Sequence, residues 1–296
     1  MEKELLIYVD GEYYPKSQAK VSVYDHGLLY GDGVFEGIRA YNGVVFRLKE
    51  HIDRLYSSAR VIMLDIPLTK EEMINAVLET LRKNNLRDSY IRLVVTRGAG
   101  DLGLDPRKCK KPTVIVITDV IRLHSDDVKE KGMRALIVWV KRDPVDATSH
   151  EVKSLNYMNS IMAKIEANIG GYDEAICLDK NGYISEGVAE NVFIVKNGKV
   201  ITPPTSTGTL VGITRDVAMK LAQKIGYIAV ECNITPTDLF TADEAFFTGT
   251  AAEIIPIVEV NKRIIANGKP GTITRRIMQE FERIIRDPKE GTPVYK

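Results

Sequence analysis

The sequence lacks the features that mark several large classes of protein. Its formal net charge is only +1 over 296 residues, so no excess of charge indicates a nucleic-acid or membrane partner. Its three cysteines, Cys109, Cys177 and Cys232, lie far apart, which favours reduced thiols over a disulfide framework. No apolar run reaches the length of a transmembrane helix, and the first residues lack the apolar run of a signal peptide. We therefore expect a cytoplasmic protein.

Common catalytic and metal-binding patterns are also missing. The four histidines show no paired spacing for a metal ion, and neither a phosphate-binding P-loop nor a nucleophile elbow is present. Gly31-x-Gly33 resembles part of a dinucleotide fingerprint, which requires a helix immediately afterwards. The β-branched and aromatic residues at 34–39 predict a strand there. We therefore reject dinucleotide binding.

The length and composition that remain are those of a soluble protein with two domains. Hydrophobic residues make up 44% of the chain and charged residues 27%, as in ordinary globular proteins, and 296 residues are many for one hydrophobic core. The polar stretch 122–131 interrupts the pattern. We therefore predict a small N-terminal domain at 1–121, an interdomain loop at 122–131 and a large domain at 132–296.

Local patterns predict the elements of the first domain. Asn42-Gly43 predicts a hairpin, and Thr69 with Glu72 predicts a capping box that opens a helix. Residues 25–33 are expected to form a glycine-rich loop, and 113–120 a strand buried on both faces. A further helix is expected at 49–63, and the other strands are expected at 5–9, 12–14, 21–24, 34–40, 44–46 and 90–96.

The second domain is expected to mix strands with helices, which gives an α+β fold rather than regular βαβ winding. The helix predicted at 156–169 places Met158, Met162, Ile165 and Ile169 on one apolar face. Turns at 179–182 and 197–198 predict two hairpins. Further helices are expected at about 212–225 and 274–285, and further strands at 135–140, 174–178, 183–185, 192–195, 199–202 and 245–247.

The stretch 153–193 contains the residue types needed to hold a carbonyl cofactor. Lys153 precedes a helix, Tyr157 follows four residues later, and Glu186 lies one hairpin further on. These supply an amine for a Schiff base, a phenol for a ring oxygen and an acid for a ring nitrogen. A lone lysine is usually a solvated surface charge. However, no charged residue follows Lys153 until Lys164, and a desolvated ammonium loses its proton more easily.

Each remaining candidate also has an ordinary structural explanation. Glu186 and Glu190 are typical hairpin acids, but Glu186 lies between two apolar strands and should need a cationic partner. The segments 212–214 and 248–251 are candidate phosphate cradles, and the first opens a helix whose free N–H groups favour an anion. Either segment is equally typical of a plain turn, and Arg54 is typical of a helix surface.

Taken in order, the motifs resemble the class IV aminotransferases, which are fold-type IV pyridoxal-phosphate enzymes, and most closely the branched-chain amino acid aminotransferases. The resemblance covers almost the whole chain. It implies a smaller N-terminal α/β domain, a larger C-terminal domain with a β-barrel-like sheet, and a cofactor between them. The motifs lie at 26–31, 34–39, 51–55, 90–92, 153–157, 186–193, 212–216 and 248–253.

The resemblance also implies a cofactor site for pyridoxal 5′-phosphate. Lys153 would form the Schiff base and carry the proton, Tyr157 would bond the phenolic oxygen, and Glu186 would pair with the pyridine nitrogen. Glu190 would lie near the cofactor edge. The remaining cofactor-binding residues implied, chiefly around the phosphate, are Arg54, Asn191, Leu210, Gly212, Ile213, Thr214 and Thr250.

The substrate site implied by the resemblance takes an aliphatic side chain and the distal carboxylate of glutamate in turn. Tyr90 with the Thr250-Ala251 turn would receive the α-carboxylate, and Arg92 the distal carboxylate. An apolar wall with an arginine at its rim suits both substrates. Tyr30 and Leu104 would reach in from a second subunit. The other substrate-binding residues implied are Phe35, Gly37 and Arg39.

These residues together predict a ping-pong transamination between branched-chain L-amino acids and 2-oxoglutarate. The expected partners are small molecules, namely branched-chain amino acids, glutamate and 2-oxo acids, and the chain is expected to form a homodimer or a hexamer. The alternatives in the same fold are a D-amino acid transaminase, an amine transaminase and an aminodeoxychorismate lyase. A non-catalytic binding protein is a further alternative, against which the presence of Lys153, Tyr157 and Glu186 together argues.

Overall fold

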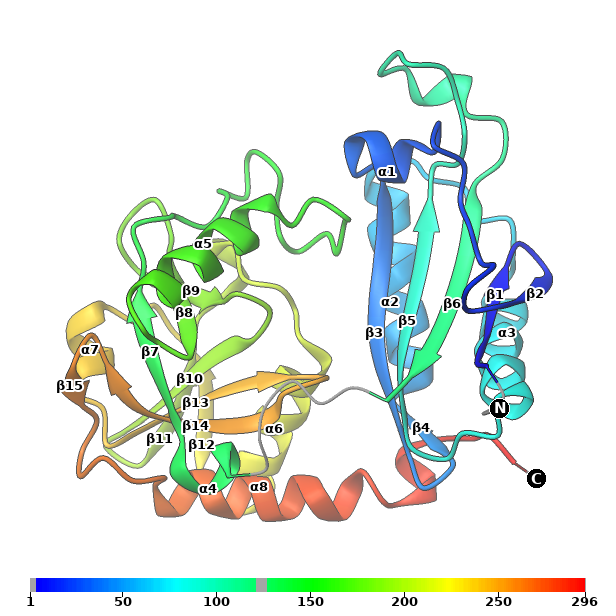
Figure 1. Cartoon of the computed structure of the whole chain (residues 1–296). Coiled ribbons are helices and arrows are strands. Elements are labelled where there is room, and N and C mark those ends of the chain that lie inside the picture. Colours follow the sequence, from blue (N-terminus) through cyan, green and yellow to red (C-terminus); the bar gives the residue numbers. More distant parts are fainter. Residues whose placement is uncertain (1–3, 121–126, 296) are drawn as a thin grey trace. The chain divides into compact units, whose positions relative to one another are not determined.

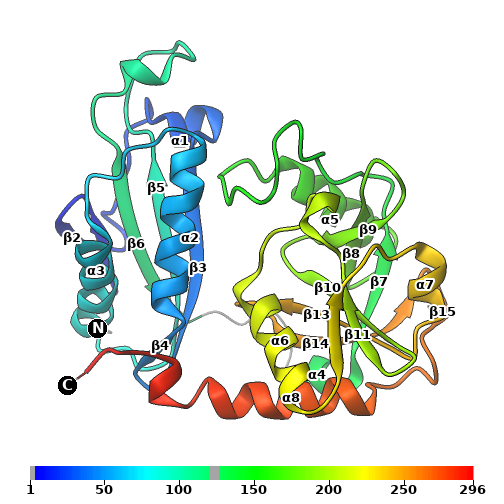
Figure 2. The same ribbon diagram turned by 180° about the vertical axis from the view of Figure 1, so that it is seen from behind.

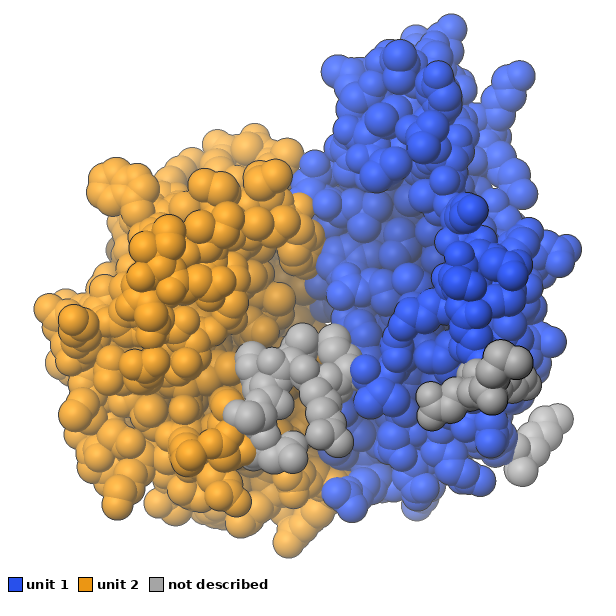
Figure 3. Space-filling model, in the orientation of Figure 1, with its two compact units in different colours: residues 1–121, 152–156, 285–296 blue, residues 122–151, 157–284 orange. Residues whose placement is uncertain are grey.

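The computed structural model describes residues 4–120 and 127–295 and divides the chain into two compact units (Figure 3). Unit 1 comprises residues 1–121, 152–156 and 285–296, and unit 2 comprises 122–151 and 157–284. The chain therefore enters unit 1 three times. The predicted domain boundaries stay a prediction. Residues 122–126 of the predicted loop lie outside the described residues, and its remainder contains the short helix α4 (Val128–Lys131).

Unit 1 is built on a seven-stranded antiparallel sheet in the order β16-β4-β3-β5-β6-β1-β2 (Figure 1). The predicted Asn42-Gly43 turn joins β3 to β4, with φ values of 48° and 81°. The long central pair β3–β5 matters most for function, because it carries most of the predicted substrate residues. The strands are β1 (Leu6–Val9), β2 (Glu12–Pro15), β3 (Gly33–Tyr41), β4 (Val44–Phe46), β5 (Ser89–Thr96), β6 (Thr113–Asp119) and β16 (Gly291–Pro293).

Two helices, α2 (Leu48–Val61) and α3 (Lys70–Lys83), cover one face of this sheet (Figure 2). The predicted capping box of α3 is confirmed, because Thr69 and Glu72 each accept a hydrogen bond from the other's backbone amide. Buried side chains such as Ile38, Leu55 and Ile91 form the core between helices and sheet. Only one face of the sheet is therefore sealed by helices.

Three predictions for unit 1 are wrong. Residues 21–24 form no strand, and Val21, Val23 and Tyr24 are exposed, so no apolar face holds them in a sheet. The predicted loop at 25–33 contains the helix α1 (His26–Tyr30), which Asp25 caps and Gly31 ends in the left-handed conformation. Strand β6 alternates buried with half-buried residues rather than being buried on both faces, because helices cover only one side of it.

Unit 2 is built on a nine-stranded sheet in the order β12-β11-β10-β13-β14-β7-β8-β9, with β15 paired to β14. Because β9 also pairs with β10, the six strands β10, β13, β14, β7, β8 and β9 close into a ring. This closed ring confirms the predicted barrel-like sheet. The strands are β7 (Met133–Ile137), β8 (Glu174–Leu178), β9 (Ile184–Gly187), β10 (Asn191–Lys196), β11 (Lys199–Thr202), β12 (Ile228–Glu231), β13 (Glu244–Gly249), β14 (Glu253–Val260) and β15 (Arg263–Ile264).

The main helices of unit 2 are α5 (Met158–Ile169), α6 (Ile213–Lys224), α7 (Pro236–Phe240) and α8 (Thr272–Ile284). Helix α5 packs on β8, and α6 packs on α8, β12 and β13. Short 3₁₀ turns lie at η1 (Pro106–Lys108), η2 (Thr205–Thr207) and η3 (Pro288–Glu290). The longest helices in the described part of the chain have 14 residues, and none there is long and apolar enough to cross a membrane.

Helix α5 does not bury its apolar face. Its apolar stripe of Met158, Met162, Ile165 and Ile169 is exposed, and the buried residues are Ser160, Ala163 and Ala167. Small side chains at this spacing let the helix backbone approach β8 closely, so packing distance outweighs the apolar stripe in choosing the inner face.

Candidate active site

Residues 152–156 are held by the backbone of strand β3 in unit 1. Phe35 N donates to Lys153 O at 3.0 Å, and Leu155 N donates to Gly33 O at 2.9 Å. These two bonds flank an antiparallel bridge and fix the segment in the register of a short strand. The position of Lys153 is therefore set by hydrogen bonds on both of its sides rather than by a free loop.

The side chain of Lys153 lies against an aromatic ring of the same unit. Its Nζ is 4.5 Å from the ring centroid of Phe35, and its backbone amide donates to Ser58 Oγ of α2 at 3.1 Å. Burial is the main cause that lowers the pKa of the nearby His51, and the positive charges of Arg54 and Lys153 also lower it. His51 is therefore neutral at physiological pH, although its Nδ1 donates a hydrogen bond to the ionised Glu36 carboxylate.

Five of the predicted substrate residues share one face of the β3–β5 pair. Phe35, Gly37 and Arg39 alternate along β3 and so leave it on the same side. On β5, Arg92 lies opposite Gly37, and Tyr90 lies opposite Arg39. The Arg92 guanidinium carbon is 4.6 Å from the Phe35 ring centroid and 5.5 Å from that of Tyr90. A Cβ at Gly37 would lie 2.1 Å from the Tyr90 hydroxyl, so glycine alone leaves room for that ring.

Arg54 is engaged by a buried acid. Its Nε and Nη2 donate to the two carboxylate oxygens of Glu36 at 2.7 and 2.8 Å, and His51 Nδ1 lies 2.8 Å from the same carboxylate. Burial by itself would raise the pKa of Glu36, but the charge and hydrogen bonds of Arg54, with those of His51, hold it at about 2. Glu36 leaves β3 on the face opposite Phe35, so Arg54 is not grouped with the substrate residues.

Tyr30 and Leu104 lie in neighbouring exposed segments of unit 1. Tyr30 ends α1 and donates its hydroxyl proton to Leu102 O at 2.6 Å. Leu104 lies in the loop between β5 and β6, whose tip extends past α1 (Figure 1), and its side chain is exposed. One hydrogen bond thus joins the two segments that are predicted to reach into a second subunit.

In unit 2, the Glu186 carboxylate receives three hydrogen bonds on a single oxygen. Oε2 accepts from Leu210 N at 2.9 Å, from Thr209 Oγ1 at 3.0 Å and from Asn191 Nδ2 at 3.4 Å. No described residue donates to Oε1. The arrangement follows from the strand pairing, because Asn191 lies directly opposite Glu186. A carboxylate saturated on one side leaves the other oxygen as an acceptor.

A buried arginine faces the open oxygen of Glu186. Arg142 Nε lies 3.3 Å from Glu186 Oε1, without the geometry of a hydrogen bond. Its Nη1 donates to Asn159 Oδ1 at 2.9 Å and to Ser160 Oγ at 3.1 Å, and its Nη2 donates to Gly187 O. The expectation that Glu186 has a cationic partner therefore holds, and the partner is an arginine that the sequence did not indicate.

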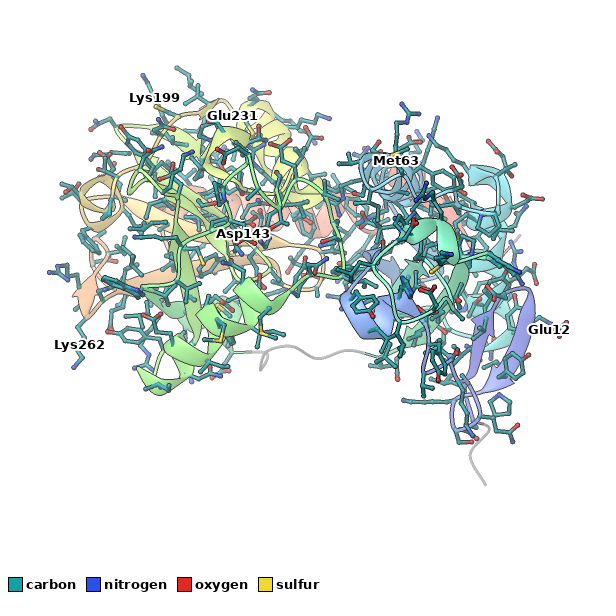
Figure 4. All side chains as sticks on the ribbon, turned by 90° about the horizontal axis from the view of Figure 1, so that it is seen from above. Glu12, Met63, Asp143, Lys199, Glu231 and Lys262 are labelled. Carbon is teal, nitrogen blue, oxygen red and sulfur yellow. The ribbon has the colours of Figure 1, made fainter. Side chains whose placement is uncertain are left out.

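His150 and Tyr157 complete this group. His150 Nε2 lies 3.1 Å from Asp143 Oδ2, and Nδ1 lies 3.9 Å from Glu186 Oε1; Asp143 is labelled in Figure 4. Burial lowers the pKa of His150, and the charge of Arg142 lowers it further. The ring of Tyr157 lies 6.4 Å from that of His150. The predicted residues Tyr157 and Glu186 are therefore linked through a neutral histidine.

The first turn of α6 has the geometry of an anion site. Its N-cap is Gly212, which makes no side-chain cap, so the amides of Ile213 and Thr214 are available to an outside acceptor. A Cβ at Gly212 would lie 2.0 Å from Asn191 Oδ1. The same asparagine donates to Leu210 O at 2.8 Å. Asn191 thus joins the Glu186 carboxylate to the start of α6.

Glu190 lies beside the second predicted cradle. A Cβ at Gly249 would lie 3.3 Å from Glu190 Cγ, and Thr250 with Ala251 forms the turn between β13 and β14 that follows. Burial raises the pKa of Glu190 to about 8, and the negative charge of Glu174 adds to the rise. At neutral pH this side chain is therefore mainly protonated.

Five residues of these networks were missed by the sequence reasoning, namely Glu36, His51, Arg142, His150 and Thr209. A usable signal existed for Glu36, because a charged residue inside an apolar strand requires a partner. No local pattern marks Arg142 or Thr209, since their contacts with Glu186 span 44 and 23 positions respectively.

Comparison with known proteins identifies the family of the chain. The family model described as amino-transferase class IV matches residues 33–260. A relative named putative branched-chain-amino-acid aminotransferase, from Methanocaldococcus jannaschii, is 58% identical over 289 residues, covering 98% of this chain and 99% of the relative.

Solved structures give the same result for the fold. The branched-chain aminotransferase of Thermoproteus uzoniensis with norvaline is 41% identical, with a TM-score of 0.92 over 99% of this chain and 100% of that one. The branched-chain amino acid aminotransferase of Thermobaculum terrenum in its PLP form is 30% identical, with a TM-score of 0.89 over 100% of both chains. Class IV aminotransferases depend on pyridoxal phosphate. This chain belongs to the class IV aminotransferase family.

Proposed function

We propose that the protein transfers amino groups between branched-chain L-amino acids (leucine, isoleucine and valine) and 2-oxoglutarate in a ping-pong reaction. The observation that supports this most directly is the placement of Lys153 Nζ 4.5 Å from the Phe35 ring centroid. That ring lies on the sheet face that also carries Gly37, Tyr90 and Arg92. The names of the relatives, which refer to branched-chain amino acids, support the same substrate class.

The residues present fit pyridoxal 5′-phosphate. Glu186 Oε1 receives no hydrogen bond from the described residues and so suits a ring N–H donor, and the uncapped start of α6 suits a phosphate. Once bound, the cofactor supplies an electron sink for the bonds at the substrate Cα. Tyr157 would bond its phenolic oxygen, while Arg54, Ile213, Thr214 and Thr250 would hold its phosphate.

Lys153 would hold the cofactor through its aldehyde carbon and, once displaced by substrate, move the proton at Cα. Both tasks require the neutral amine. The Phe35 ring lies against the amine and covers one side of it. The hydrogen bonds at 152–156 fix the backbone, so the amine moves only through its side-chain torsions.

The substrate side chain would contact Phe35 and the open space above Gly37. Arg92 stacks on Phe35 and Tyr90, which keeps its guanidinium beside the apolar wall and allows it to bind the distal carboxylate of glutamate. Tyr90 and the Thr250-Ala251 turn would receive the α-carboxylate. Tyr30 and Leu104 would complete the pocket from a second subunit of a homo-oligomer.

The test is the visible spectrum of the purified protein before and after addition of L-leucine, followed by a screen of amino donors with 2-oxoglutarate. We expect a cofactor band that changes with L-leucine, and turnover with L-leucine, L-isoleucine and L-valine. Lys153→Ala should lower turnover by at least about a thousandfold. A preference for D-alanine would assign a different class IV reaction, and a colourless protein that binds no cofactor would reject the proposal.

A further inference from the structure

The strongest unexplained feature of unit 2 is a fully buried guanidinium. Arg142 is only 1% exposed and Glu186 only 5%. A buried arginine is costly unless its charge and its donors are all satisfied. The two terminal nitrogens of Arg142 donate hydrogen bonds to three polar atoms, but its Nε makes no hydrogen bond. Hydrogen bonding at Nε therefore does not explain why the Arg142 guanidinium is buried beside Glu186.

The position of the guanidinium shows what the charge acts on. Nε lies 3.3 Å from Glu186 Oε1, close enough for strong attraction in a buried site. Because the terminal nitrogens are fixed by Asn159, Ser160 and Gly187 O, the guanidinium cannot turn to donate to that oxygen. Arg142 therefore stabilises the charge on the carboxylate without occupying its open acceptor position.

The other basic group near this carboxylate does not replace Arg142. His150 Nδ1 is 3.9 Å from Oε1, beyond hydrogen-bonding distance, and burial together with Arg142 lowers the pKa of His150. Among the described residues these two are the basic side chains within ion-pair distance of Glu186. The acids Glu190 and Glu174 belong to the neighbouring network and add negative charge.

We propose that Arg142 is a positioning residue that holds the Glu186 carboxylate in place and leaves its Oε1 open, so that this oxygen accepts the ring N–H of the bound cofactor. The inference rests on the proposed function, because it assigns the ring nitrogen to Glu186. Loss of Arg142 leaves the buried Glu186 carboxylate without its cationic partner. The carboxylate is then no longer held in place, and the ring nitrogen loses its acceptor.

The first test is a double-mutant cycle on the full-length protein without cofactor, using Arg142→Met, Glu186→Gln and the double variant. Arg142→Met should lower the melting temperature by about 5–10 °C, because it leaves a buried charge unpaired. Glu186→Gln in the same chain should restore most of that loss. If the two losses simply add, Arg142 does not act on Glu186 and the inference fails.

A matched control separates this effect from the packing of Arg142. Ser160→Ala removes one acceptor of Nη1 but leaves Nε beside Glu186. Its loss of stability should be the same with Glu186 and with Gln at position 186. If Arg142→Met does not fold, recovery of soluble protein in the double variant is the same rescue. If both fail to fold, Arg142→Lys, which keeps a positive charge, decides the question in the second test.

The second test reads the ring nitrogen directly, through the ¹⁵N chemical shift of ¹⁵N-labelled pyridoxal phosphate bound to the full-length protein. The wild-type protein and Ser160→Ala should show a protonated nitrogen. Arg142→Met should show a neutral nitrogen and at least about tenfold weaker cofactor binding, and Arg142→Lys should keep the protonated signal. A protonated nitrogen in Arg142→Met would overturn the inference.

The two tests also separate this inference from the proposed function. If the wild-type protein binds no cofactor, the proposed function fails, and the cycle still shows whether Arg142 and Glu186 are coupled. If the wild-type protein catalyses transamination but the cycle shows no coupling, the proposed function stands and the role of Arg142 is rejected.

Discussion

The two units bury acidic side chains in opposite charge states. Glu36 in unit 1 pairs with Arg54 and His51, which hold its pKa at about 2 against the effect of burial. Glu190 in unit 2 has no basic group within ion-pair distance among the described residues, and burial with Glu174 raises its pKa to about 8. Burial alone therefore does not decide the charge of an acid. The nearest cation decides it.

Removal of the cation that pairs with Glu36 should have the largest effect on stability. Arg54→Met removes the main cationic partner of the buried Glu36 carboxylate, and should lower the free energy of unfolding by about 3–5 kcal/mol at pH 7. Urea unfolding of the cofactor-free protein measures the loss. In the double variant with Glu36→Gln, most of the stability should return. A single variant as stable as the wild type would show that the buried pair contributes nothing.

Acid tests the same pair without mutation. The folded-state pKa of Glu36, about 2, lies below its ordinary value of 4.5, so the folded state binds fewer protons than the unfolded state. Its stabilising effect is complete above pH 4.5 and is lost as the pH falls towards 2, for a total of about 3 kcal/mol. The lowered pKa of His51 adds loss below about pH 6.5. Glu36→Gln should flatten the dependence of the free energy of unfolding on pH between pH 4.5 and 2. Hydrogen exchange of the β3 amides measures this dependence.

Glu190 should make the stability of the protein depend on pH in the opposite direction. Its folded-state pKa of about 8 lies above the ordinary value of 4.5, so the folded state binds more protons than the unfolded state. Stability is therefore highest below pH 4.5 and falls as the pH rises towards 8, by about 2 kcal/mol between pH 5 and 7. Glu190→Gln should remove this slope, as measured by hydrogen exchange in β10. An unchanged slope would assign the titration to another group.

The success of the sequence reasoning depended on whether a feature is local. The turn at Asn197-Gly198 was predictable because two residues decide it, and their φ values of 52° and 72° fit the expected hairpin. The capping box of α3 lies within four residues. By contrast, α5 faces inward with Ala163 and Ala167 because of its distance from β8, which no pattern within the helix specifies.

The candidate site divides in the same way. The positions of Lys153, Tyr157 and Glu186 were identified through motifs with fixed spacing, and their chemical roles remain proposals. The groups that set the charge of each acid, such as Arg54 for Glu36 and Arg142 for Glu186, come from distant segments. The sequence indicated that Glu186 needed a cation, but which cation supplies it depends on how β9 and the 138–151 loop meet.

The short β4 strand has a consequence for how the lysine is placed. Strand β3 has nine residues, whereas β4 has three and pairs only with Ala40 and Tyr41. The edge of β3 near Gly33–Phe35 is thereby left for residues 153–155, which bond to it instead. A β-hairpin extended by a few residues would compete for the same amides and carbonyls. The early end of β4 thus leaves the edge of β3 open for the segment that carries Lys153.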